Sequence, residues 1–82
     1  RAYLFDSTWG ISDFTSEPTI GFTAEGIGKA LIRLMLPQKD EYKVFRGEKQ
    51  LGADQVSIKN NIVEIQFFSE KKVKEKIKVV GK

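Results

Sequence analysis

The chain has 82 residues, 14 of them basic and 11 acidic, and it contains neither cysteine nor histidine. The missing cysteine excludes disulfides and thiolate zinc sites, and the missing histidine removes the usual general base and the commonest transition-metal ligand. The net charge of +3 is too small to indicate a nucleic-acid partner without a concentrated basic patch.

This length predicts a single domain that covers residues 1–82. No apolar run approaches the roughly 18 residues that a membrane-spanning helix needs. Because the chain starts at Arg1 rather than at methionine, we interpret it as a processed product or as part of a larger protein.

The first segments of the chain are rich in aromatic residues but irregular. Residues 1–6 are β-prone and can lie at the edge of a sheet. Residues 7–17 carry isolated apolar side chains at Trp9, Ile11 and Phe14, which a linker would lack. We therefore expect a loop or a short strand that packs on the domain.

Two strands joined by a turn are predicted next. Residues 19–24 alternate apolar and small or polar side chains, which is typical of a half-buried strand. Over residues 30–36 only Arg33 is polar. Glycine and proline bound this short run, which favours a buried strand over an amphipathic helix. The glycines of residues 25–28 indicate the turn between the two strands.

A further β-prone segment covers residues 42–45, after a polar turn predicted at residues 37–41. We expect it to lie beside residues 30–36 and to form with them the central antiparallel pair of the domain. Gly47 then offers the positive φ that a tight hairpin requires, and residues 52–54 indicate a second turn.

The strongest local prediction is a hairpin whose turn is Asn60-Asn61. Both asparagines tolerate the left-handed conformation that a type I′ turn demands. Residues 55–59 alternate before the turn, with Val56 and Ile58 predicted to face inward. Residues 62–68 alternate after it, and their predicted inward side chains are Val63, Ile65 and Phe67.

The last strand is predicted over residues 73–80, after a turn at residues 69–72. A helix is the alternative here, because helix-forming residues are frequent. Lysines alternate with the other side chains at a period of two, which favours the strand.

Six or seven short strands with regularly spaced turns predict an all-β domain, a small antiparallel β-sandwich with Greek-key-like connections. A partly open β-barrel is the alternative. The predicted core contains Ile32, Leu34, Val56, Ile58, Val63, Ile65 and Phe67.

Catalytic signatures are weak throughout the sequence. Residues 26–29 lack the remaining glycines and the spacing of a phosphate-binding loop. The carboxylates Asp6, Asp13 and Glu17 are candidates for acid–base chemistry or calcium binding, but turn formation explains them more simply. We therefore predict no catalytic residue, no metal site and no cofactor.

The aromatic side chains Tyr3, Trp9 and Phe14 are the candidate contacts with a ligand or partner. A ring on a rigid sheet face can stack on a sugar or anchor an interface. The simpler hypothesis is that these rings fill the small core. For Trp9 the choice lies between a lid over the sandwich and an exposed anchor, and we prefer the lid.

A basic face is predicted on the last strand, formed by Lys74, Lys76 and Lys78. We interpret these lysines as protection of a sheet edge, because lysine opposes edge-to-edge pairing. Nucleic-acid binding is the alternative, although this face lacks the interleaved aromatic residues on which single-stranded bases stack.

Residues 28–37, followed by residues 41–46, Gly47 and Lys49, resemble the C-terminal β-sandwich of multidomain glycoside hydrolases. In that family a Gly-Lys-apolar-Leu-Pro segment precedes Tyr-x-Val-aromatic and a glycine hairpin. The resemblance covers about residues 20–80. It implies an appendage without catalytic activity that packs on the catalytic domain or helps to hold polysaccharide. The matching region contains no tryptophan.

The expected function is therefore that of a non-catalytic accessory or interaction module of a larger carbohydrate-active protein. Its expected partners are a neighbouring domain, another protein or a polysaccharide. A free-standing protein that binds nucleic acid through the lysine face is the alternative. The charged, cysteine-free composition with one methionine also suits a heat-adapted source.

Overall fold

The computed structural model describes residues 3–16, 19–36 and 42–81. These residues form seven strands and no helix, and the strands join into one antiparallel sheet that is not closed into a barrel. The all-β prediction is confirmed, and the helix alternative for residues 73–80 is wrong. The strands are β1 Tyr3–Ser7, β2 Gly10–Thr15, β3 Ile20–Met35, β4 Tyr42–Arg46, β5 Lys49–Gln50, β6 Val56–Lys59 and β7 Ile62–Gly81.

The part of the chain that the structure describes contains no helix that could cross a membrane.

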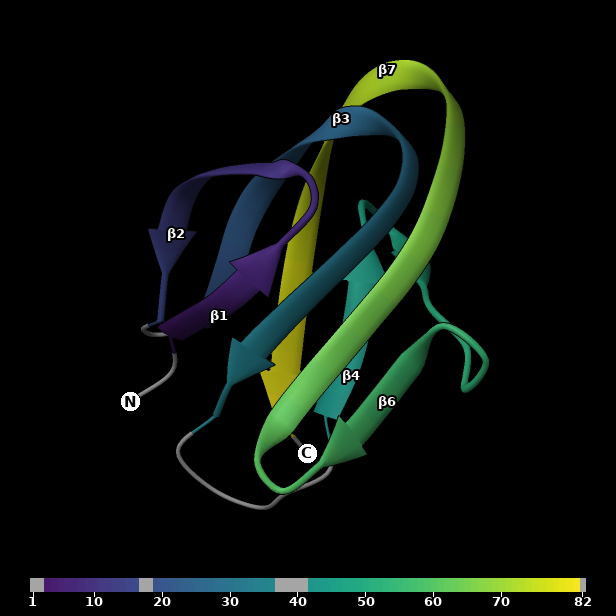
Figure 1. Cartoon of the computed structure of the whole chain (residues 1–82). Helices are drawn as coiled ribbons and strands as arrows, with labels where there is room; N and C mark the ends of the chain where they lie inside the picture. The colour runs from purple at the N-terminus through teal and green to yellow at the C-terminus, as the bar shows by residue number, and fades with distance from the viewer. Residues whose placement is uncertain (1–2, 17–18, 37–41, 82) are drawn as a thin grey trace.

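The two longest strands, β3 and β7, pair along their length and bend together, so that the sheet folds over on itself (Figure 1). The first layer has the strand order β2, β3, β7, β4 and β5, with β3 represented by residues 20–26 and β7 by residues 73–81. Strand β5 pairs with the end of β4 and forms the outer edge. In the second layer, residues 28–35 of β3 and 62–69 of β7 lie between β1 and β6. The domain is therefore a sandwich whose two layers share their central strands.

The bend lies between the pair Gly26–Val73 of the first layer and the pair Gly28–Ser69 of the second. One residue of β3 spans this corner, whereas three residues of β7 do so. The longer path belongs to β7 because β7 follows the outside of the bend (Figure 1). Gly28 has a φ of +82°, which glycine reaches without steric cost.

Both turns predicted in this region are wrong in the same way. Residues 25–28 and 69–72 do not end a strand, because β3 and β7 continue through them. Glycine and polar residues are typical of turns, but they also allow a strand to bulge and bend. The sequence pattern therefore indicates correctly where the chain changes direction, but the strand ends predicted there are wrong.

The central pair predicted from residues 30–36 and 42–45 does not form. Along this part of β3, one edge pairs with β7 and the other with β1, so no edge remains for β4. Strand β4 pairs with the last part of β7 instead. Nearness in sequence favoured the wrong partner, because the true partner comes much later in the chain. The turn predicted at residues 37–41 lies outside the described residues.

The core lies between the two layers, and its buried apolar residues are Trp9, Phe22, Ala24, Ala30, Ile32, Leu34, Leu36, Val44, Leu51, Val63, Ile65, Phe67, Ile77 and Val79. Five of the predicted core residues are among them. The prediction fails on β6, where Val56 is half-buried and Ile58 is 41% exposed. Strand β6 pairs with β7 on one side only, so its inward side chains have neighbours on one side.

Two connections between the layers, β1 to β2 and β5 to β6, each carry a buried side chain. Trp9, between β1 and β2, folds into the core with 5% of its surface exposed, and Leu51, just after β5, does so with 6%. The indole packs edge-on against Phe67, with 5.1 Å between ring centroids. Arg46 lies over the same phenyl ring at 4.5 Å and pairs with Glu75 at 3.0 Å. The lid arrangement predicted for Trp9 is confirmed.

The predicted short turns also form. Asn60 and Asn61 have φ values of 53° and 69°, and Lys59 pairs with Ile62 across them. Gly47 has a φ of +64° in the hairpin that joins β4 and β5. In the turn predicted at residues 52–54, the N–H of Gln55 donates to the carbonyl of Gly52 at 2.9 Å.

Replacing Asn61 by glycine should leave the free energy of unfolding unchanged or raise it, because glycine takes a positive φ at no steric cost. Asn61→Val should lower it by about 1–2 kcal/mol, since a β-branched side chain is strained in the left-handed region. Urea denaturation of the two variants measures both effects. A clear loss of stability in Asn61→Gly would contradict the role of backbone conformation at this turn.

Candidate binding site

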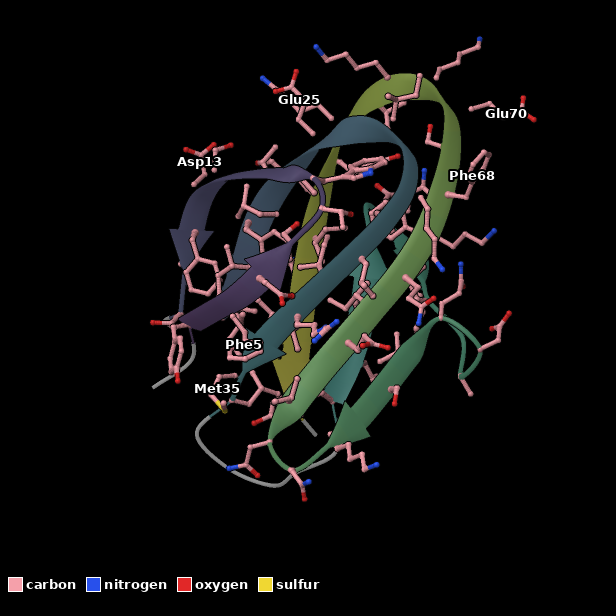
Figure 2. The ribbon with its side chains drawn as sticks, viewed as in Figure 1. Phe5, Asp13, Glu25, Met35, Phe68 and Glu70 are labelled. Carbon is pink, nitrogen blue, oxygen red and sulfur yellow. The ribbon has the colours of Figure 1, made fainter. Side chains whose placement is uncertain are left out.

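Two of the carboxylates considered for catalysis, Asp6 and Asp13, lie in different layers. Asp6 on β1 faces Arg33, with 3.6 Å between Oδ1 and Nε. Asp13 lies in a bulge of β2 with a φ of 55°, and Figure 2 shows its side chain pointing away from the sheet. Glu17 lies outside the described residues. Within residues 3–16, 19–36 and 42–81 there is no group of three or more potential metal-ligating side chains.

Of the three aromatic contact candidates, Tyr3 is exposed, with 53% of its surface accessible, and Trp9 is a core residue. Phe14 is half-buried and stacks on Phe22 at 5.9 Å between centroids. The stacking depends on the bulge in β2, because the register shift around Asp13 turns the side chain of Phe14 toward the core. Contact of Tyr3 with a partner stays a prediction.

Lys74, Lys76 and Lys78 are exposed on one face of β7, as predicted. Strand β4 pairs with residues 77–81 of β7, and the N–H of Gly47 donates to the carbonyl of Lys76, so the edge-protection interpretation is wrong for Lys76 and Lys78. At Lys74, β7 pairs only with β3 among the described strands, and edge protection there stays a prediction. Glu25 pairs with Lys74 across the strands, and Asp13 lines a shallow pocket with Lys76. These carboxylates reduce the positive potential of the face and disfavour the nucleic-acid alternative.

A different aromatic residue, Phe68 on β7, has the most exposed side chain among the described large apolar residues, at 61%. It points away from the ribbon (Figure 2). An open groove of about 300 Å³ lies beside it, lined also by Lys29, Gln55, Gln66 and Phe67. We call this surface the Phe68 groove. Lys29 is the cross-strand partner of Phe68, which brings its side chain close to the ring.

Two amide side chains of the Phe68 groove are held by hydrogen bonds. Gln66 Nε2 donates to Glu64 Oε1 at 3.1 Å, and Gln55 Oε1 accepts from the N–H of Gly52 at 3.3 Å. The backbones of the two glutamines are joined by a hydrogen bond of 2.8 Å. Within the described residues, Gln66 Oε1 and Gln55 Nε2 make no such bond, so one acceptor and one donor remain for a ligand.

This combination can recognise a sugar ring. A pyranose has faces of C–H groups and a rim of hydroxyls, and the face of an aromatic ring carries the negative part of its quadrupole. The amides and the ammonium of Lys29 supply donors and an acceptor at the rim. A groove of about 300 Å³ is at the small end of ligand sites, which suits a single sugar unit of a longer chain.

The sequence signal that indicates the outward position of Phe68 is the alternation of residues 62–68. Inward-facing Val63, Ile65 and Phe67 place Phe68 on the outward face with Gln66 by simple alternation. The groove itself could not be found in this way, because Lys29 and Gln55 come to it from other parts of the chain.

Comparison of the chain with protein-family models, with curated proteins and with solved structures finds no match. A functional interpretation therefore depends on the surfaces that the structure describes.

Proposed function

We propose that this domain is a non-catalytic accessory module that binds carbohydrate in the Phe68 groove. The observation that supports the proposal most directly is the exposed phenyl ring with Lys29, Gln55 and Gln66 beside it. The proposal keeps the accessory role in a larger carbohydrate-active protein that the resemblance to glycoside hydrolase C-terminal domains implies.

The groove is well placed for binding without rearrangement. Phe68 and Gln66 belong to β7 and pair with Lys29 and Leu31 of β3. On the other side, the N–H of Gln66 donates to the carbonyl of Gln55, next to the ladder between β6 and residues 62–65 of β7. A ring fixed on such a strand loses little conformational freedom when a ligand binds, which lowers the entropic cost of association. The sugar ring would lie on the phenyl face and exchange hydrogen bonds with the two amides.

The surface proposed to contact a neighbouring domain is formed by β1 and lies outside the Phe68 groove. Tyr3 and Phe5 on β1 are 53% and 51% exposed, and Tyr3 pairs with Met35 across the strands. Aromatic residues and methionine are enriched at protein interfaces. In Figure 2, Phe5 and Met35 lie near the lower left and Phe68 at the upper right, so that the two surfaces can be used at the same time.

Phe68→Ala should weaken carbohydrate binding about tenfold or more, which corresponds to about 1.4 kcal/mol. Its melting temperature should stay close to that of the wild type, because the ring is largely exposed. Affinity electrophoresis in gels with soluble α-glucan, β-glucan, xylan or mannan measures the binding. Phe5→Ala is the matched control, since it removes a similarly exposed phenyl ring outside the groove.

Two results would reject the proposal: no binding to any of these polysaccharides, or equal binding by Phe68→Ala and the wild type. The nucleic-acid alternative has its own signature. It requires binding of a single-stranded oligonucleotide that weakens steeply with salt and that is lost when Lys74, Lys76 and Lys78 are changed to glutamine.

A further inference from the structure

A second groove, of about 310 Å³, lies on the side of the sandwich between β4 and β6. Its apolar lining consists of Tyr42, Val44, Leu51, Ala53, Val56 and Ile58. Val44 and Leu51 are buried, whereas Ile58 is 41% exposed although it faces inward. The second layer ends here, because no described strand pairs with the outer edge of β6.

The register of the hairpin shows which backbone groups of β6 face outward. The two-residue turn makes Lys59 and Ile62 a hydrogen-bonded pair, and hydrogen-bonded and non-hydrogen-bonded pairs then alternate. The bond from the N–H of Gln66 to the carbonyl of Gln55 fits this alternation. The N–H and C=O groups of Val56 and Ile58 therefore point away from β7, toward the groove side.

We propose that the outer edge of β6 accepts an extended segment of a partner protein as an additional antiparallel strand. Each partner residue opposite Val56 or Ile58 would exchange two backbone hydrogen bonds with it and point its own side chain inward, because directly paired residues share a face. The inward side chains would cover Leu51 and must be apolar. Antiparallel pairing is chosen because it is the more stable ladder per residue.

The charge of β6 indicates which residues fit the outward positions of the partner segment. Its other residues would face outward beside Ser57 and Lys59, and Lys59 is the charged side chain of β6 on this face. Acidic side chains fit there, so the partner is an extended segment that alternates apolar and acidic residues. Lys59 also opposes pairing between two copies of β6, which favours this partner over a second copy of the chain. The inference is independent of the carbohydrate proposal, because it concerns a different groove.

The test uses the peptide Glu-Ile-Glu-Ile-Glu-Ile-Glu and the amide NMR spectrum of the domain. Binding should shift the signals of Val56, Ile58 and Leu51. N-methylation of the isoleucines removes the N–H groups that face β6 and should weaken binding at least tenfold. N-methylation of the glutamates removes N–H groups that face solvent and should leave the affinity within about twofold of the parent peptide, since antiparallel partners bond at alternate residues.

A pair of domain variants tests the same edge. Ile58→Lys places a charge at an inward but partly exposed position and should weaken peptide binding at least tenfold. Ser57→Lys changes the outward face of the same strand and should bind at least as well as the wild type. The proposal is overturned if the unmodified peptide does not bind at millimolar concentration, or if both N-methylated peptides bind equally. It is also overturned if the domain forms a dimer through β6 that the peptide cannot displace.

Discussion

Trp9→Ala should destabilise the domain by about 3–5 kcal/mol, a large part of the stability that a domain of this size has. Trp9 is 95% buried, and its ring contacts Phe67 in an edge-on arrangement. The N–H and the carbonyl of Trp9 are both held by the hydroxyl of Ser7, which fixes the connection between the layers. Alanine would leave a cavity at a position where both layers meet, because the ring covers one open side of the sandwich.

Intrinsic fluorescence and urea denaturation check this expectation. The wild type should show blue-shifted emission that is protected from quenchers, and Tyr3→Ala should change the free energy of unfolding by no more than about 0.5 kcal/mol. Trp9→Phe should cost less than Trp9→Ala, because it keeps a ring and removes a buried Nε1–H that has no partner among the described residues. A cooperatively folded Trp9→Ala variant that loses less than about 1 kcal/mol would contradict the lid role.

Gly26→Ala should destabilise the domain by about 1–3 kcal/mol, although alanine is normally tolerated in a strand. A Cβ atom at this position would lie 2.7 Å from two carbon atoms of the Trp9 ring. The indole is buried and cannot move aside freely. Gly26 does not have a positive φ, so the expected loss comes from steric overlap and not from backbone conformation.

Gly10→Ala is the matched control, because its Cβ would meet its nearest neighbour at an ordinary 3.6 Å. The overlap should be relieved when the ring is made smaller. In a Trp9→Leu background, Gly26→Ala should therefore cost at least about 0.5 kcal/mol less than in the wild type. Additive losses, or equal losses in Gly26→Ala and Gly10→Ala, would show that the ring is not the cause.

The local structure of this domain could be predicted from the sequence because its signals are local. Alternation placed Val63, Ile65 and Phe67 in the core, and the two asparagines identified the hairpin turn. Strand pairing could not be predicted in the same way. Gly26 and Gly28 look like a turn in the sequence, and only the pairing of β3 with β7 shows that they form a bend inside one strand.

The candidate site also has one part that the sequence predicts and another part that depends on strand pairing. The outward position of Phe68 follows from alternation, whereas its neighbours in the groove come from three separate segments of the chain. Lys29 reaches the ring through the β3–β7 ladder, and Gln55 reaches it through the hairpin that joins β6 and β7. The burial of Trp9 was predicted as a preference, but its contact with Gly26 depends on the bend and had no signal in the sequence.

The central position of β7 also determines when this domain can fold during synthesis. Strand β7 is the last of the seven to leave the ribosome, yet it lies in the middle of both layers. Before it emerges, β4 and β6 lack the neighbour with which they pair, and β3 lacks the longer of its ladders. Closing pairs such as Ile20 with Val79 joins residues that are far apart in the chain, which is a slow step in folding. Strands β1 and β2 can pair with β3, and β5 with β4, before that point, but β6 and the edges of β3 and β4 that face β7 stay unpaired until β7 has been made.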